Sequence, residues 1–272
     1  MPLWLALSTI WGFSFVFIKV SGTFLDPFQT SFGRLFLGFL VLGGYLVATR
    51  RRPILRGPAV RHLALCAVLA QAVPFTLFAW AEHHISSVAA GLVNSTMSLW
   101  TGLLAIVILP EERLDRLRGT GLLIGFAGVV VLLGVWDAPF RGDWFAYLAC
   151  GLSTMGYSIS ALWTRRFLTP MGLDPISAMT TQLGLAAFVT GLVTAALSSP
   201  PTQWPISGVL SLVALGALGT GLALAINYVL IQRAGAMTTS TVTYTIPIVS
   251  TVAGAVLLRE AVHWYEPVGA AI

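Results

Sequence analysis

The sequence predicts an all-α polytopic membrane protein in which ten transmembrane helices form two inverted five-helix repeats. Hydrophobic residues make up 57% of the 272 residues and charged residues only 9%, whereas a soluble domain carries roughly 25% charged residues. Apolar runs of about 20 residues, the length that crosses a bilayer core, recur along the whole chain. The second half also repeats features of the first. Composition therefore places the protein in a lipid bilayer, and the repetition divides it into two halves.

Polar, proline and glycine residues separate the apolar spans from one another. We expect spans at residues 3–20, 28–49, 61–82, 86–109, 119–136, 143–164, 175–197, 206–231 and 236–258, and a tenth that opens near Tyr265. Only eight residues run from Tyr265 to Ile272, fewer than the about 20 that a spanning helix needs. We therefore expect the last helix to be truncated and the natural chain to continue. The first span does not resemble a removable signal peptide, because no basic residue precedes it and no cleavage site follows it.

Basic residues indicate the orientation of the spans, because cytoplasmic loops retain Lys and Arg. Eleven of the fifteen Lys and Arg residues lie in the four loops that share one side: Arg50, Arg51, Arg52, Arg56, Arg61, Arg113, Arg116, Arg118, Arg165, Arg166 and Arg233. Both termini are therefore expected in the cytoplasm. The net charge of +5 reflects this sorting, so no nucleic-acid partner is expected.

The two halves match at a constant offset. A shift of 148 residues places Asp26–Pro27 on Asp174–Pro175 and Glu112 on Glu260, and a shift of 144 places Gly12 on Gly156. The predicted repeats are residues 1–137 and 143–272. Five spans per repeat force the second copy into the membrane upside down. Several secondary transporters are built this way, with the substrate site near the midplane between the repeats.

The sequence offers little for catalysis or metal binding. It lacks a phosphate-binding loop, and the adjacent His83 and His84 point apart on a helix. We expect neither a cofactor nor a metal. An enzyme acting on lipid-linked substrates would need a reactive cluster, and the stretch from Glu111 to Arg118 is the one candidate; it is more simply a charged loop. The acidic residues lie at span ends, so we expect facilitated movement of substrate rather than a central proton relay.

Uncharged polar and aromatic residues lie inside the spans, where they should face other helices or a hydrated cavity. Trp11 lies near the centre of its span rather than in an interfacial belt, so we expect it to line a substrate path. Gly12 should let neighbouring backbones approach. The candidate substrate-binding residues are Trp11, Phe15, Phe75, Phe78, Asn94, Ser98, Trp100, Tyr157, Trp163, Asn227 and Tyr244.

Four charged residues within or beside the spans need an explanation. Arg34, seven residues into the second span, requires a partner or a water path, and Asp26 and Glu82 are both candidates. Lys19 is expected to reach the outer interface. Glu112 and Glu260 precede short helices whose amino-terminal dipoles they would compensate.

The motif WGFSF at residues 11–15, Lys19, the Asp26–Pro27 turn, Arg34 and the glutamates at 112 and 260 together resemble the drug/metabolite transporter superfamily. The resemblance covers the whole chain and is strongest to the ten-helix EamA type, and within it to YddG-type aromatic amino-acid exporters. It implies an inner-membrane exporter of amino acids or other small metabolites. A drug or nucleotide-sugar carrier of the same superfamily is the alternative.

The chain departs from this family at one position. The family typically has a proline in the fourth helix. In this chain the ninth helix has such a proline, Pro247, but the matching position of the fourth helix, 148 residues earlier, is Leu99. The sequence therefore puts in doubt any mechanism that needs matched kinks in both repeats.

Overall fold

The computed structural model describes residues 2–108, 116–132, 143–265 and 268–269. Within these ranges all regular structure is helical. Eight helical segments are long and apolar enough to cross a membrane: Pro2–Ser21, Pro27–Ala48, Ala59–Ala81, Ser87–Ile108, Trp144–Met171, Pro175–Leu197, Ile206–Ala234 and Thr238–Leu258. The protein is therefore a helical, multi-pass membrane protein, as the sequence predicts.

Several of these segments consist of more than one helix. The α-helices are α1 (Pro2–Ser21), α2 (Pro27–Ala48), α3 (Ala59–Ala67), α4 (Val73–Ala81), α5 (Ser87–Asn94), α6 (Met97–Ile108), α7 (Arg116–Leu132), α8 (Trp144–Trp163), α9 (Pro175–Leu197), α10 (Ile206–Gly216), α11 (Ala223–Ala234), α12 (Ala236–Ser240) and α13 (Ile246–Ala253). Between or after them lie the π-helical turns η1 (Val68–Ala72), η3 (Thr164–Leu168), η5 (Ala217–Leu222) and η7 (Gly254–Leu258), and the 3₁₀ turns η4 (Thr169–Met171) and η6 (Thr241–Tyr244).

The predicted spans agree with these helices to within a few residues, apart from the sixth and the fifth. The sixth runs on through η3 and η4 to Met171. The fifth predicted span, 119–136, overlaps α7, which fills the described stretch 116–132; residues 133–136 of this span lie outside the described residues. The tenth predicted span lies almost wholly outside the described residues. The count of ten spans therefore stays a prediction.

Aspartate and proline determine where α2 and α9 begin. The Asp26 carboxylate accepts a hydrogen bond from the Gln29 amide (2.9 Å), and the Asp174 carboxylate accepts one from the Ser177 amide (2.9 Å). In each helix a proline follows the cap at the first helical position, where its missing N–H has no helical partner to lose. The two helices start 148 residues apart and pack against each other.

The third and eighth spans contain π-helical turns at equivalent positions. The turn η1 begins at Val68, and η5 begins at Ala217, within one residue of the 148-residue shift. Such turns leave backbone carbonyls outside the regular helical pattern and are frequent at functional sites. The third and eighth spans therefore share a local deformation that could not be predicted from their apolar sequences.

The fourth and ninth spans are also interrupted at equivalent positions. Both repeats therefore have a break here, although the fourth span lacks the proline that the ninth has. The fourth breaks at Ser95–Thr96 and the ninth at 241–245. At the first break the Ser95 and Thr96 hydroxyls donate to carbonyls three residues back (2.7 Å each); at the second, Thr243 does the same (2.7 Å). At both breaks, side-chain hydroxyls thus donate hydrogen bonds to backbone carbonyls of the preceding turn. The first break forms without a proline.

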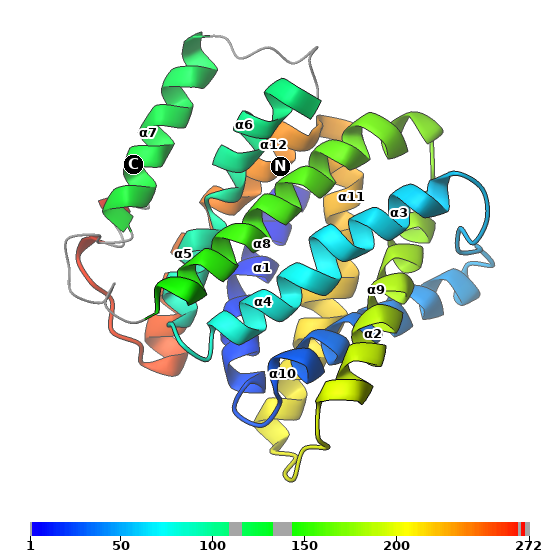
Figure 1. Cartoon of the computed structure of the whole chain (residues 1–272), viewed down its shortest axis with the longest axis horizontal. Coiled ribbons are helices and arrows are strands. Elements are labelled where there is room, and N and C mark those ends of the chain that lie inside the picture. Colours follow the sequence, from blue (N-terminus) through cyan, green and yellow to red (C-terminus); the bar gives the residue numbers. More distant parts are fainter. Residues whose placement is uncertain (1, 109–115, 133–142, 266–267, 270–272) are drawn as a thin grey trace.

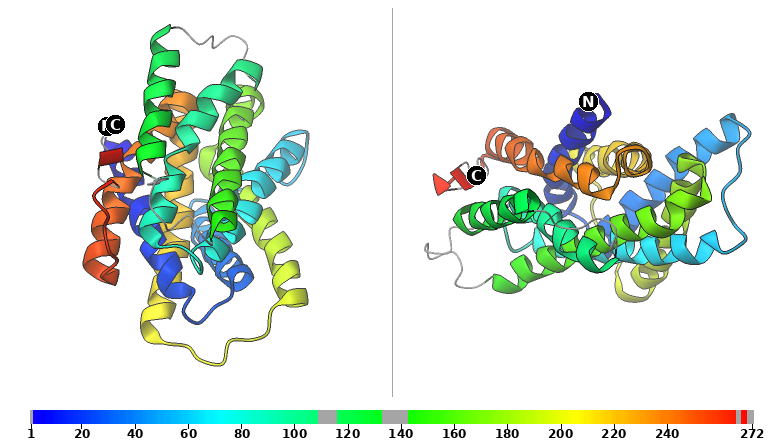
Figure 2. Two further views of the ribbon diagram at one scale, coloured as in Figure 1. Left: turned by 60° about the vertical axis from the view of Figure 1, so that its left-hand side comes forward. Right: turned by 90° about the horizontal axis from the view of Figure 1, so that it is seen from above.

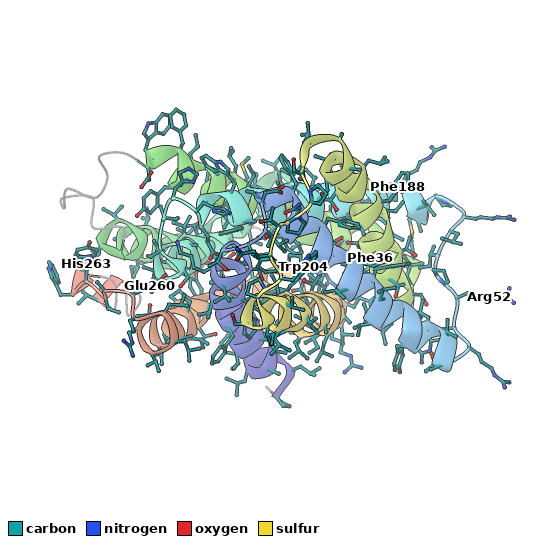
Figure 3. The ribbon with its side chains drawn as sticks, turned by 90° about the horizontal axis from the view of Figure 1, so that it is seen from below. Phe36, Arg52, Phe188, Trp204, Glu260 and His263 are labelled. Atoms are coloured by element: carbon teal, nitrogen blue, oxygen red, sulfur yellow. The ribbon has the colours of Figure 1, made fainter. Side chains whose placement is uncertain are left out.

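The helices pack in two groups that meet at the centre of the molecule. On one side α4 and α6 pack against α8, and on the other α1 packs against α10 and α13; Figures 1 and 2 show α4 and α8 side by side, with α1 and α10 behind them. Gly12 confirms the expected close approach, because a Cβ there would lie 2.4 Å from the Val249 Cβ. In Figure 3, Phe36 and Phe188 lie on the outer face of α2 and α9, where lipid covers apolar side chains.

Candidate functional site

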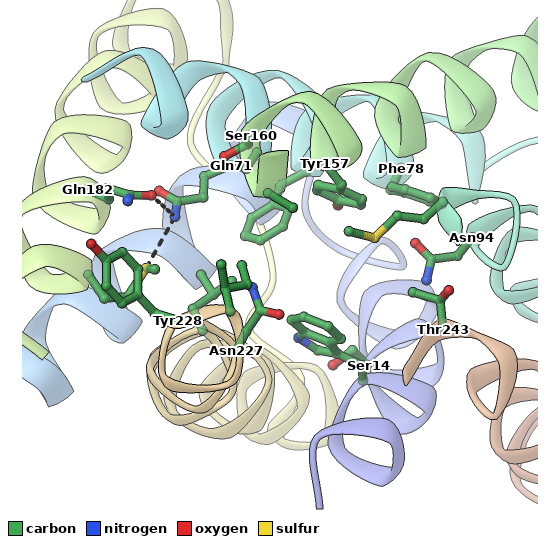
Figure 4. A pocket seen from close by; sticks show the side chains of 18 of the residues that line it. Ser14, Gln71, Phe78, Asn94, Tyr157, Ser160, Gln182, Asn227, Tyr228 and Thr243 are labelled. Carbon is green, nitrogen blue, oxygen red and sulfur yellow. Dashed lines mark hydrogen bonds between the residues drawn. The ribbon is translucent and has the colours of Figure 1, made fainter. Parts of the chain in front are cut away.

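A cavity of about 90 Å³ lies at the centre of the helices. One water molecule needs about 10–15 Å³ of such space, so the cavity has room for several waters or part of a small ligand. Its lining comes from both halves of the chain: α1, α2, η1, α4, α5 and α6 in the first, and α8, η3, α9, α11 and η6 in the second (Figure 4).

Aromatic side chains form one continuous wall of this cavity. The Tyr157 ring stacks on Phe78 with centroids 6.0 Å apart and packs edge-on against Phe75 at 6.3 Å. Phe15 meets Phe78 edge-on at 5.7 Å. Such a wall can bind an aromatic or apolar group through area burial and ring contacts.

Trp11 completes the wall from α1 and is fixed by a hydrogen bond. Its Nε1 donates to the Gly219 carbonyl in η5 (3.2 Å). The π-helical turn supplies this acceptor, so the deformation of the eighth span has a direct structural use. Ser14, one turn further along α1, lines the cavity as well.

Uncharged polar residues make up about half of the remaining lining. In Figure 4 the Gln71 amide points to the Gln182 amide, to which its Nε2 donates (3.1 Å). Asn94 and Asn227 reach the cavity from α5 and α11. No Asp, Glu or His occurs among the described residues that line the cavity.

Arg34 is the cavity's single cationic residue among the described lining. Its side chain is 4% exposed, and its Nε donates to the Thr220 hydroxyl in η5 (3.1 Å). Residue 182 lies 148 positions after residue 34 and makes the corresponding contact, because Gln182 bonds to Gln71 in η1. In both halves, therefore, a polar side chain of the second span contacts the π-helical turn of the other half.

The cavity contains seven of the eleven residues that the sequence proposes: Trp11, Phe15, Phe75, Phe78, Asn94, Tyr157 and Asn227. The other four lie elsewhere. Trp163 donates to His62 Nδ1 (3.1 Å), Ser98 donates to the Ser95 carbonyl (3.0 Å), and Tyr244 is 45% exposed. Trp100 is half-buried outside the lining.

The candidates chosen from the sequence did not include the two glutamines or Arg34, although all three line the cavity. Gln71 and Gln182 are single amides within apolar runs, so a search for polar residues inside spans could have found them. Arg34 has no carboxylate within ion-pair distance among the described residues, so neither Asp26 nor Glu82 is its partner by direct contact. The expected acidic partner is replaced by Thr220 and the ring of Phe75.

Two further expectations concern charged residues. The Lys19 ammonium donates to the carbonyls of Glu82 and Ile85, which follow the third span, so the expectation that it reaches the outer interface stays a prediction. Glu260 caps a helix amino terminus, but that of α5 in the other half: it accepts from the Ser87 and Val88 amides (3.1 and 3.2 Å). Glu82 follows α4 directly and is 2% exposed, outside the cavity lining.

The described residues include no group of three or more metal-ligating side chains, and the cavity carries no nucleophile paired with a base. A many-spanned helical protein with a polar and aromatic cavity at its centre has the architecture of a membrane transporter. The chain belongs to the EamA-like transporter family, which matches it twice, at residues 1–134 and 144–272. It is therefore a transporter rather than an enzyme.

Relatives along the whole chain carry the same designation. The uncharacterized transporter YcxC of Bacillus subtilis is 25% identical over 97% of this chain and 86% of its own length, and an uncharacterized transporter of Archaeoglobus fulgidus is 21% identical over 97% and 90%. The aromatic amino acid exporter YddG of Ancylobacter novellus is 33% identical, over 60% of this chain and 55% of its own. A solved crystal structure matches the fold with a TM-score of 0.77 at 22% identity, covering 99% of this chain and 92% of the other.

Proposed function

We propose that this transporter exports small metabolites, with aromatic amino acids favoured, across the cell's inner (plasma) membrane through the central cavity. The observation that carries the proposal is that the aromatic wall of Phe15, Phe75, Phe78 and Tyr157 and neutral amides line the same cavity. An aromatic side chain can pack on such a wall, while amides offer hydrogen bonds to the polar end of an amino acid. The name of the Ancylobacter novellus relative agrees with this substrate class.

Counterflow in proteoliposomes tests the cavity residues. Asn94→Ala and Asn227→Ala should each lower counterflow of labelled phenylalanine by about tenfold, since each removes a hydrogen-bonding group that faces the cavity. Tyr244→Ala should transport at the wild-type rate, because the Tyr244 side chain is largely exposed and outside the lining. Thermal unfolding of each purified variant supplies the control for folding. Wild-type rates in both asparagine variants, or no counterflow of any amino acid by the parent protein, would contradict the proposal.

The proposed direction of transport requires a defined orientation, with the loop at residues 50–61 in the cytoplasm. Cysteine placed at Arg56 should resist an impermeant maleimide applied to intact cells, whereas cysteine at Gln203, in an exposed loop on the other side, should react. The native thiols of Cys66 and Cys150 are buried, so they add little background labelling. Reaction at position 56 with protection at position 203 would reverse the orientation.

A further inference from the structure

Arg34 is a buried cation with no carboxylate within ion-pair distance among the described residues; Glu82 acts on its charge only from further away. Its Nε donates to the Thr220 hydroxyl, and the Thr220 hydroxyl in turn donates to the Leu215 carbonyl (2.9 Å). The Thr220 hydroxyl therefore donates its proton to the Leu215 carbonyl, and its oxygen accepts the hydrogen bond from Arg34. This relay fixes the direction of the guanidinium plane.

The ring of Phe75 holds the same guanidinium from one face. The Arg34 Cζ lies 3.7 Å from the Phe75 ring centroid, a favourable cation–π distance. The two terminal nitrogens remain without a hydrogen-bond acceptor among the described residues, and Arg34 lines the cavity. A charged side chain is costly inside a membrane protein and marks a functional site when it faces a cavity. The cavity thus presents an oriented guanidinium edge.

Other polar atoms of the lining are also unpartnered. The Gln71 Oε1 is buried and accepts no hydrogen bond among the described residues, and the Tyr228 hydroxyl, also buried, has only the Gln232 side chain near it. Buried polar groups are normally satisfied by protein, water or ligand. Their presence in the same lining as Arg34 indicates a cavity built for a polar occupant.

The charge of the lining defines which end of a substrate is recognised. A guanidinium fork matches the two oxygens of a carboxylate, whereas the described lining offers no acidic side chain to an ammonium group. Phe75 contacts both the guanidinium and Tyr157, so the cationic group and the aromatic wall are adjacent. A ligand with a carboxylate next to an aromatic body can reach both.

We propose that Arg34 binds the carboxylate of the substrate, and that the transporter therefore recognises aromatic monocarboxylates whether or not they carry an amino group. This rests on the proposed function, which it deepens by naming the recognised group. The amino group of an amino acid is tolerated but contributes little to affinity.

Three ligands that share one phenyl group separate the contributions. Phenylalanine has both charged groups, 3-phenylpropionate lacks the amino group, and phenethylamine lacks the carboxylate. Competition against labelled phenylalanine in counterflow and thermal stabilisation of the purified protein both report binding. We expect 3-phenylpropionate to compete within about threefold of unlabelled phenylalanine, and phenethylamine to compete at least tenfold less well. Phenethylamine competing as well as 3-phenylpropionate, with phenylalanine transport intact, would overturn the carboxylate site and leave the proposed function standing.

Substitution of Arg34 tests the same site without depending on transport. Arg34→Gln places at this position the amide that the other half carries at Gln182, so the helix can accept it. It should abolish stabilisation by 3-phenylpropionate, and Arg34→Lys should weaken it, because an ammonium keeps the charge but loses the fork. Arg61→Gln, the same change at an exposed position, should bind as the parent does. Stabilisation of Arg34→Gln equal to that of the parent, or none in the parent, would refute the proposal even if no amino acid is transported.

Discussion

Gly156→Ala is expected to destabilise the protein severely. A Cβ at this position would lie 2.4 Å from the Leu69 carbonyl oxygen, which belongs to the π-helical turn η1. The contact atom is backbone, so the added methyl cannot be accommodated by a side-chain rotation; α8 and η1 must move apart. Overpacking of this kind costs about 1–3 kcal/mol, and the displacement would also disturb Tyr157 and Gln71 in the cavity.

The same helix provides the control for this experiment. A Cβ added to Gly151 meets no atom within 4 Å, so Gly151→Ala should leave stability unchanged or slightly raised, because alanine favours the helix. Thermal unfolding of both variants in the same detergent compares them directly. Equal melting temperatures for the two variants would show that α8 and η1 are not in the close contact described above.

Glu260→Ala is expected to have the second largest effect, because it removes the cap of α5. The Glu260 carboxylate accepts from the Ser87 and Val88 amides and from the Ser87 hydroxyl (2.7 Å), while Ser86 accepts from the Ala89 amide. The first three amides of α5 are thus satisfied. Hydrogen bonds to charged groups are worth about 1.5–3 kcal/mol, so the alanine variant should lose about 2 kcal/mol of unfolding free energy, less than the upper end of the range for Gly156→Ala.

A double-mutant cycle identifies the contact responsible for that loss. Glu260→Ala and Ser87→Ala should couple by about 1 kcal/mol, since each removes one partner of the same hydrogen bond. Glu260→Gln should lose less, because its amide oxygen can still accept. Asp143→Ala is the control: Asp143 precedes α8 without a side-chain capping bond, and its loss should change little. Additive effects of the Glu260 and Ser87 substitutions would exclude the contact.

The spans could be predicted because their signal is local. A run of apolar residues needs only its own length and composition to favour a bilayer, and Asp26 and Asp174 cap helices through amides three residues away. These features do not depend on how the helices pack. Seven of the candidate residues line the cavity for a related reason, since aromatic and amide groups near the centre of a span have few stable locations other than a cavity.

Whether a candidate residue lines the cavity depends on the direction of its side chain rather than on its position along the chain. Trp163 and Tyr244 are as aromatic as Trp11, but Trp163 turns toward His62 and Tyr244 lies in a 3₁₀ turn that leaves it exposed. Helix periodicity assumes a regular helix through each span. Ser98 and Trp100 follow the break at Ser95–Thr96, and Tyr244 lies within the break at 241–245, so faces extrapolated from a regular helix do not apply to these three residues.

By itself, the sequence determined the membrane class, the boundaries of most spans and the resemblance to a transporter family, because hydrophobic length and short-range capping act within a single helix. Only the tertiary structure decided which polar groups meet. Arg34 lies 186 residues from the hydroxyl that orients it, and Glu260 lies 173 residues from the helix that it caps. In the low dielectric of the interior each of these groups must find a partner, and the partner is set by how helices cross, which no local pattern records.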